Sequence, residues 1–336
     1  MIRLRVDSAT ARFPDSAWLT VVTDTPTIRA TSWMVAAAAP TLRSSAGGVG
    51  TASDPDAEGE EDDMKADLVT EALERLGVSS TEPNRECLDL VYRRWGQMVP
   101  FDSLRKRVFQ AAGAEGPVPG ATASSFLSGW LRDGTGGSCW STSSGLHALL
   151  KALGFDARLV FGVMLTDPDT RPNHGTVLVD LDERTWLVDS SMLFDRPFEL
   201  PSSHGGTHRP DPVHPVGARR LADDRGWLVE WRPAHSELVV GCEISLVTAD
   251  PGAWDQAHDR TRKHSLFNQS LYARRNTIDG IIAYGRNKLV NRDRSGQLAT
   301  THIADDEVAR MLVDTFGYSA SFVENLPEDE LGPAFL

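Results

Sequence analysis

The sequence predicts an α+β protein in which a helical part comes first and a strand-rich part follows. Between residues 65 and 153 the apolar residues recur at helical spacing, as Leu146, Leu149 and Leu150 illustrate. After Gly154 the apolar period changes toward two, which is the period of a strand with one buried face. Helices and strands that are segregated along the chain in this way are typical of the α+β class.

Four helices are expected in the first part. The first ends at Gly77, because glycine readily adopts the left-handed conformation that closes a helix. A Ser/Thr/Glu/Pro start signal precedes the second, which residues 87–95 outline. Pro100 interrupts the helical pattern, and a third helix is expected over residues 124–131. The fourth begins at Cys139.

The strand-rich part is expected to contain two groups of strands and a final helix. Residues 176–181 and 184–188 form a hairpin-like pair around Asp182-Glu183. The stretch from 202 to 219 is rich in His, Gly and Pro and is expected to be a loop. Further strands are expected at residues 157–165, 227–232, 237–247, 272–275, 280–284 and 297–303, with a helix at 305–316.

Residues 1–63 do not share the patterns of the part that follows. Apolar residues are sparse among Ser, Thr, Pro and Ala, and the stretch from Asp54 to Asp63 is strongly acidic. We expect a disordered extension here, or translation that begins at Met64. The start of the sequence also lacks the apolar block of a signal peptide.

Composition argues against several classes of function. The 336 residues carry a net charge of −13 and the pI is near 5.1, which disfavours nucleic acid or an anionic membrane as the main partner. No apolar run approaches the roughly twenty residues needed to span a bilayer. Three scattered cysteines form neither a disulfide framework nor a C-x-x-C zinc motif, so a cytoplasmic location is expected.

The stretch from Thr135 to Leu153 contains the best candidate nucleophile. A flexible Gly136-Gly137 pair leads to Cys139, which begins the fourth helix. Unpaired N–H groups and the positive end of the helix dipole stabilise a thiolate at this position. The alternative is a small buried hydrophobic residue, which is the usual state of a free cysteine.

Two later residues complete a catalytic arrangement with Cys139. His174 precedes the apolar run of residues 176–179, and Asp189 ends the short strand that starts near Trp186. A cysteine at a helix start, a histidine at a strand start and an aspartate at a strand end supply a nucleophile, a base and an orienting group. Taken singly, the histidine is typical of a loop and the aspartate of a strand end.

Other candidate residues have weaker patterns. His204, His208 and His214 suggest a metal site, but no matching Cys or carboxylate frame accompanies them, so a solvated loop without metal is expected. Trp140 and Phe101 are candidate walls of an apolar acceptor pocket. The alternative is that both are ordinary core aromatics.

In the order and spacing of its motifs, the chain from about Leu68 to Phe316 resembles the arylamine N-acetyltransferase family, which is related to the transglutaminase and papain-like cysteine enzymes. Each motif alone is weak, whereas their succession over that length is specific. The motifs are residues 71–77 (EALERLG), 99–104 (VPFDSL), 136–139 (GGSC) and 149–155 (LLKALGF), the strand after His174, and residues 186–189 (WLVD).

The resemblance implies a papain-like cysteine-enzyme core in three parts after the extension. These parts are a helical bundle over residues 64–154, a central β-barrel over 155–248 and a C-terminal α/β lid over 249–336. The bundle would carry the nucleophile, and the barrel would carry the histidine and the aspartate.

The resemblance also implies the site and the reaction. Cys139, His174 and Asp189 would form a catalytic triad, and Phe101, Trp140 and Gly137 of this chain would contact substrate. An acetyl group would move from acetyl-CoA, a donor substrate rather than a bound cofactor, to a small aromatic amine, hydrazine or arylhydroxylamine. The acyl-cysteine intermediate would give ping-pong kinetics.

Two single positions and one four-residue stretch depart from the pattern of the resembling family. Thr135 stands where arginine is usual, Ser141 where glutamate is usual, and residues 190–193 read SSML where Val-Gly-Phe-Gly is usual. Two other functions therefore stay open. One is an amide synthase or transglutaminase-like cysteine hydrolase that uses the same triad on another acyl donor. The other is a non-catalytic binding protein on an inherited scaffold.

Overall fold

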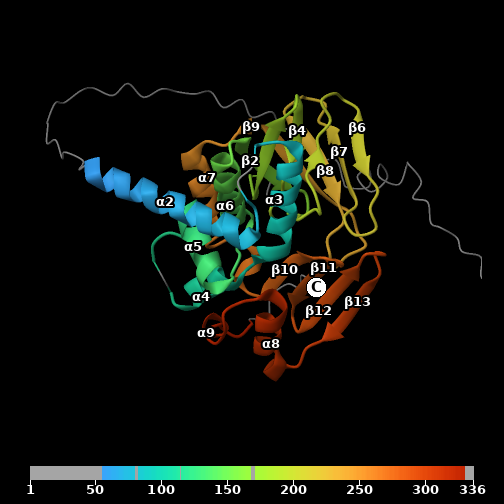
Figure 1. The fold of residues 1–336 in the computed structure, drawn as a ribbon. Helices are drawn as coiled ribbons and strands as arrows, with labels where there is room; N and C mark the ends of the chain where they lie inside the picture. Colours follow the sequence, from blue (N-terminus) through green and yellow to red (C-terminus); the bar gives the residue numbers. More distant parts are fainter. Residues whose placement is uncertain (1–54, 80–81, 114, 168–170, 330–336) are drawn as a thin grey trace, which may run out of the picture. The chain divides into compact units, whose positions relative to one another are not determined.

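The computed structural model describes residues 55–79, 82–113, 115–167 and 171–329 (Figure 1). The extension expected over residues 1–63 lies outside the described residues up to position 54. Its last part belongs to helix α2 (Pro55–Leu76), which begins earlier than the apolar pattern indicates. Among the described helices, none is long and apolar enough to cross a membrane.

Helices form the first part of the described chain, and polar caps set where two of them begin. The Asn84 side chain accepts a hydrogen bond from the Cys87 N–H, and Thr122 accepts one from the Ser125 N–H. The helix at 104–111 was not predicted, because three consecutive basic residues interrupt its apolar pattern. After α2 the helices are α3 (Arg85–Met98), α4 (Leu104–Ala111), α5 (Ala123–Asp133) and α6 (Cys139–Ala152).

Large aromatic side chains hold these helices together. The ring of Trp95 in α3 lies 5.8 Å from Phe126 and 6.4 Å from Trp130, both in α5, and all three side chains are fully buried. Each contributes about 1.5–3 kcal/mol by its removal from water. A Cβ at Gly145 of α6 would collide with Phe126, so a glycine at this point lets α6 approach α5.

The middle of the chain forms an eight-stranded antiparallel sheet in the order β5-β4-β3-β2-β9-β8-β7-β6. The edge strands β5 and β6 meet where Thr207 Oγ1 donates to the Glu199 carbonyl at 2.9 Å, so the sheet is a nearly closed barrel. Helix α6 packs against β2 and β3. The strands are β2 (Asp156–Met164), β3 (His174–Leu181), β4 (Arg184–Leu187), β5 (Phe198–Glu199), β6 (Gly206–Arg209), β7 (Val216–Arg220), β8 (Gly226–Trp231) and β9 (Val240–Thr248).

The loop expected over residues 202–219 is wrong in part, because β6 and β7 lie within it and pair with each other. Val216, Gly217 and Ala218 are buried in β7, but only two apolar side chains stand among Gly and Arg residues, so the sequence shows no period of two here. The hairpin expected around Asp182-Glu183 is confirmed. Both residues have positive φ, 53° and 60°, as a two-residue turn between β3 and β4 requires.

The last part of the chain combines helices with a five-stranded antiparallel sheet in the order β1-β10-β11-β12-β13. Strand β1 (Phe101–Asp102) comes from the helical part, where Phe101 pairs with Arg274 and Asp102 with Ala273. Four elements here, α7, η1, β12 and α9, were not predicted. The elements are α7 (Pro251–Arg260), η1 (Leu266–Asn268), β10 (Tyr272–Thr277), β11 (Gly280–Gly285), β12 (Lys288–Asp293), β13 (Leu298–His302), α8 (Asp305–Met311), η2 (Leu312–Phe316) and α9 (Ala320–Val323).

The predicted fold class is confirmed: N-terminal helices precede a nearly closed antiparallel barrel and a C-terminal α/β region. The domain boundaries expected at residues 154 and 248 stay predictions. Strand β1 belongs to the first of these parts in sequence but pairs with β10 of the last part. Phe101 of β1 also forms a bridge with Gly137, just before α6, so the C-terminal sheet lies beside the start of α6, where Cys139 lies.

Candidate active site

Cys139 is the first residue of α6, as the sequence predicts. The turn before it is held by Asp102, whose carboxylate accepts a 2.6 Å hydrogen bond from the Gly136 N–H. The Asp102 N–H in turn donates to the Gly137 carbonyl at 3.1 Å. A Cβ at Gly136 would collide with the Pro100 carbonyl, so only glycine fits at this position.

The first turn of α6 directs the positive end of the helix dipole at the Cys139 side chain. Ser138 is the N-cap residue, and its side chain makes no capping hydrogen bond, so its hydroxyl does not neutralise this end of the helix. Cys139 is half-buried, whereas Cys87 and Cys242 are buried. The accessible thiol of this chain is therefore the one at the helix start.

His174 is the first residue of β3 and only 3% of it is exposed. Across the sheet it faces Gly162 of β2. A Cβ at Gly162 would lie 3.0 Å from His174 Cδ2, so this glycine leaves room for the imidazole ring. The strand pairing thus sets the position of the ring.

Asp189 follows β4 and is completely buried. Its Oδ2 lies 2.7 Å from His174 Nε2. Its Oδ1 accepts hydrogen bonds from the Ser191 N–H and hydroxyl, both at 2.9 Å, and from the Met192 N–H at 2.6 Å. The two carboxylate oxygens therefore have separate tasks: one holds the histidine and the other is held by the turn that follows.

Side chains from α3 and β10 hold the turn that follows Asp189. The Tyr92 hydroxyl donates to the Asp189 carbonyl at 2.7 Å. Arg274 donates to the Ser191 carbonyl at 3.2 Å and to the Met192 carbonyl at 2.6 Å. Asn276 donates to the carbonyls of the next two residues, Leu193 and Phe194.

Electrostatics follow from these contacts. Burial lowers the pKa of His174, but the facing Asp189 carboxylate and a hydrogen bond to Cys139 outweigh it and raise that pKa well above its usual value. Burial raises the pKa of Asp189, but His174 and the N–H groups of the turn hold it at about 2. The aspartate is thus ionised at neutral pH, and the histidine beside it can hold a proton.

Cys139 and His174 open onto one cavity of about 340 Å³. Of the predicted substrate-binding residues, Phe101 and Trp140 line it. Gly137 is not among the lining residues, and a binding role for it stays a prediction. Its backbone is instead packed so closely that a Cβ there would collide with the Ser141 hydroxyl.

The sequence analysis missed several lining residues. Tyr272 and Arg274 lie on one face of β10, a relation that strand alternation within the predicted strand would have shown. His235, from the loop before β9, could not be found this way because no local pattern marks it. The other lining residues include Met192, Trp231 and Phe267, which come from three separate parts of the chain.

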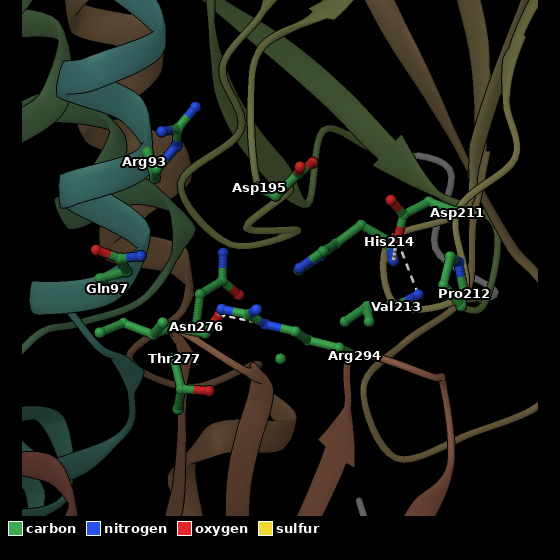
Figure 2. A pocket seen from close by; sticks show the side chains of 12 residues that line it. Arg93, Gln97, Asp195, Asp211, Pro212, Val213, His214, Asn276, Thr277 and Arg294 are labelled. Carbon is green, nitrogen blue, oxygen red and sulfur yellow. Dashed lines mark hydrogen bonds between the residues drawn. The ribbon is translucent and has the colours of Figure 1, made fainter.

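The three histidines considered for a metal site have different surroundings. His204 is exposed and lies 3.9 Å from Asp224, and His208 lies on the exposed side of β6. His214 is buried and points into a second cavity of about 380 Å³, toward Asn276 (Figure 2). Within the described residues, no group of three His, Cys, Asp or Glu side chains is arranged to hold a metal ion.

The chain was compared with models of protein families and with curated protein sequences. A model of an N-acetyltransferase family matches residues 91–323. No curated protein sequence is significantly similar to the chain.

Solved structures of arylamine N-acetyltransferases have the same fold. The enzyme of Mycobacterium marinum has a TM-score of 0.65 at 20% identity, over 77% of this chain and 95% of that one. Arylamine N-acetyltransferase C from Bacillus anthracis has a TM-score of 0.61 at 20% identity, over 75% and 98% of the two chains. The Salmonella typhimurium enzyme has a TM-score of 0.63 at 16% identity, over 80% and 94%. Since the family model matches well over half of its length, the chain belongs to the arylamine N-acetyltransferase family.

Proposed function

We propose that this enzyme transfers an acetyl group from acetyl-CoA to an arylamine, hydrazine or arylhydroxylamine through an acetylated Cys139. His174 is the base and Asp189 is the residue that orients it. The observation that carries the proposal is the 2.7 Å contact between His174 Nε2 and Asp189 Oδ2, on a ring that also bonds to Cys139. Nucleophile, base and orienting carboxylate in this order form a catalytic triad.

The first half-reaction acetylates the enzyme. Asp189 occupies Nε2 of His174, which leaves Nδ1 to take the proton of the Cys139 thiol. The thiolate, stabilised by the start of α6, attacks the carbonyl carbon of the thioester. The bond between that carbon and the CoA sulfur breaks, and His174 returns the proton to this sulfur. Free CoA and acetyl-Cys139 are the products.

The second half-reaction passes the acetyl group to the acceptor. The amine nitrogen attacks the carbonyl carbon of acetyl-Cys139, and His174 takes the proton that the nitrogen loses. The carbon–sulfur bond breaks, and the same proton returns to the thiolate of Cys139. An amide leaves and the enzyme is restored, so the two substrates act in turn.

Observations on relatives and on the cavity support the donor and the acceptor. The Mycobacterium marinum enzyme has been solved in complex with CoA. The Bacillus cereus relative is described as having a Cys-His-Glu triad, so a carboxylate other than aspartate serves in that protein. In this chain Phe101 and Phe267 meet edge to face with centroids 5.1 Å apart in the cavity wall, a surface suited to an aromatic ring.

The test is release of CoA from acetyl-CoA in the presence of a panel of arylamines and hydrazines. Wild type is compared with Cys139→Ala and with Cys87→Ala, a control that removes a buried thiol far along the chain in α3. We expect turnover in wild type and Cys87→Ala and none in Cys139→Ala. Turnover that survives in Cys139→Ala would contradict the acyl-cysteine.

If wild type does not turn over acetyl-CoA but its Cys139 thiol still reacts quickly with iodoacetamide at neutral pH, the acyl donor is a different compound. The amide synthase or transglutaminase-like hydrolase would then be the function of the same triad. The residues that depart from the family pattern, Ser141 and residues 190–193, adjoin the site and would be the first place to seek the altered specificity. An unreactive Cys139 would instead indicate a non-catalytic binding protein.

A further inference from the structure

Three buried hydroxyl groups form a chain beneath the start of α6. The Ser190 hydroxyl lies 2.8 Å from Thr142 Oγ1 and 2.8 Å from Ser143 Oγ. Thr142 Oγ1 lies 2.8 Å from the Ser138 carbonyl, and Ser143 Oγ lies 3.0 Å from the Gly175 carbonyl. The three side chains that carry these hydroxyls are at most 1% exposed, so water does not compete for these contacts.

The ends and the centre of this hydroxyl chain adjoin the three proposed catalytic residues. Ser138 directly precedes Cys139, Gly175 directly follows His174, and Ser190 directly follows Asp189. These neighbours lie on three different elements: the start of α6, the start of β3 and the turn after β4. A single row of contacts therefore ties together the three backbone segments that carry the triad.

We propose that Ser190, together with Thr142 and Ser143, is a positioning residue that holds the three triad-bearing segments in register. This rests on the proposed function of Cys139, His174 and Asp189. None of the three hydroxyls needs to touch substrate. Each acts through the backbone of a residue next to the reacting groups, where a shift of about 1 Å is enough to cost roughly a hundredfold in rate.

Of the three hydroxyl groups, that of Ser190 can be removed without leaving another buried hydroxyl unpaired. Three hydroxyls supply three protons to four oxygen–oxygen contacts, so three of the four contacts are hydrogen bonds at any moment. If Ser190 loses its hydroxyl, Thr142 can donate to the Ser138 carbonyl and Ser143 to the Gly175 carbonyl. No buried hydroxyl is then left without a partner, so the loss of stability is small while the link from α6 and β3 to the Asp189 turn is gone.

Only a hydroxyl at position 190 can contact both Thr142 and Ser143 by hydrogen bonds. An aliphatic side chain cannot join two hydroxyl groups. The row of contacts is therefore interrupted if any one of the three residues becomes aliphatic, and both contacts are lost only if Ser190 does.

The test uses Ser190→Ala and Thr142→Val, with Thr142→Ser as the variant that keeps the hydroxyl. Thr176→Val is the matched control, because Thr176 is completely buried in β3 and its hydroxyl has no hydrogen-bond partner. The measurements are kcat and KM for acetyl-CoA, the rate of alkylation of Cys139 by iodoacetamide between pH 5 and 9, and the melting temperature.

We expect Ser190→Ala and Thr142→Val to lower kcat and the Cys139 alkylation rate at neutral pH by at least tenfold. The KM for acetyl-CoA should change less than twofold and the melting temperature by a few degrees at most. Thr142→Ser should recover most of the rate, and Thr176→Val should behave as wild type. Equal effects of Ser190→Ala and Thr176→Val on the alkylation rate would overturn the proposal.

The alkylation arm separates this proposal from the proposed function. If acetyl-CoA is not turned over but Ser190→Ala still slows alkylation of Cys139, the positioning role holds and the donor assignment fails. If Ser190→Ala alkylates at the wild-type rate while acetyl-CoA turnover is normal in wild type, the transferase stands and the positioning role is wrong.

Discussion

Two buried histidines of this protein line different cavities, and their pKa values are shifted in opposite directions. His174 is 3% exposed and faces the Asp189 carboxylate, and its pKa is raised well above the usual value. His214 is 8% exposed, and burial lowers its pKa to about 3, with the nearby cation of Arg274 adding to the decrease. The burial of the two rings is similar, whereas the charges around them differ.

The two histidines differ in the charges that face them and not in their burial. Burial lowers the pKa of both rings. A carboxylate at 2.7 Å reverses this for His174, so that ring can hold the proton of a thiol. Arg209 and Arg232 reinforce the decrease for His214, and Asp211 offsets it only in part, so that ring stays neutral at pH 7.

Arg274 connects the two cavities. It lines the cavity that contains Cys139, and its charge lowers the pKa of His214 in the other. Its guanidinium also holds the carbonyls of Ser191 and Met192 in the turn after Asp189.

The largest effect is expected from Asp189→Asn. Three hydrogen-bond donors face Oδ1, so the amide oxygen stays there and the amide NH₂ replaces Oδ2 opposite His174 Nε2. The ring must then carry its proton on Nδ1 and cannot accept one from Cys139. We expect kcat to fall by about 10⁴-fold, as in other triads that lose this carboxylate.

Nitrogen NMR of the histidine rings tests the cause of this loss. In wild type His174 should remain an imidazolium above pH 7, and in Asp189→Asn it should become neutral with the tautomer protonated at Nδ1. Asp180→Asn, a partly buried aspartate in β3 that pairs with Arg158, is the control and should leave the His174 signals unchanged. A His174 that is unchanged in Asp189→Asn would show that Asp189 does not set its charge.

A smaller loss is expected from Arg274→Gln. The shorter amide cannot hold both carbonyls of the turn, so Asp189 becomes less well placed and kcat should fall by about ten- to a hundredfold. At the same time the pKa of His214 should rise, because the cation that lowers it most is removed. Steady-state kinetics and a proton NMR titration of His214 measure the two effects in one variant.

Arg275→Gln is the matched control for Arg274→Gln. Arg275 is the next residue of β10, and its guanidinium donates to the carbonyls of Gln97 and Thr315, away from the turn. We expect this variant to lose stability but to keep its kcat within about twofold. Equal losses of kcat in the two variants would mean that Arg274 acts only through general stability.

The smallest effect on catalysis is expected from His214→Gln, which should leave kcat unchanged and alter the pH dependence of stability. The pKa of His214 is about 3 in the folded protein and near 6.5 when unfolded, so the unfolded state binds more protons between these values. Its contribution to stability is present above pH 6.5 and is lost as the pH falls toward 3. The slope is at most about 1.4 kcal/mol per pH unit.

Urea unfolding at pH 4.5, 5.5 and 7 measures this slope as the difference between wild type and His214→Gln. A difference is needed because Asp102, whose pKa burial raises to about 6, acts in the opposite direction. Its contribution is present below its usual pKa of 3.8 and is lost as the pH rises toward 6. If the free energy of unfolding changes with pH in the same way in wild type and His214→Gln, His214 titrates normally in the folded protein.

Local sequence was sufficient to find the helix start at Cys139, the strand start at His174 and the strand end near Asp189. Each of these depends on periodicity and on the conformational preferences of glycine and apolar residues over a few neighbours. The same local rules predicted the α+β class and the hairpin at Asp182-Glu183. They did not find β6 and β7, because these strands are short and consist largely of Gly, His and Arg residues.

Only the tertiary structure decided how these residues become a site. Arg274 reaches the Ser191 carbonyl from more than eighty residues away in the chain, and Ser190 contacts Thr142 and Ser143 of α6, which lie more than forty residues before it. The opposite pKa shifts of His174 and His214 also arise only in the folded protein. Their pKa values depend on charges brought near by folding, and Coulomb interactions depend on distance in space and not on separation along the sequence.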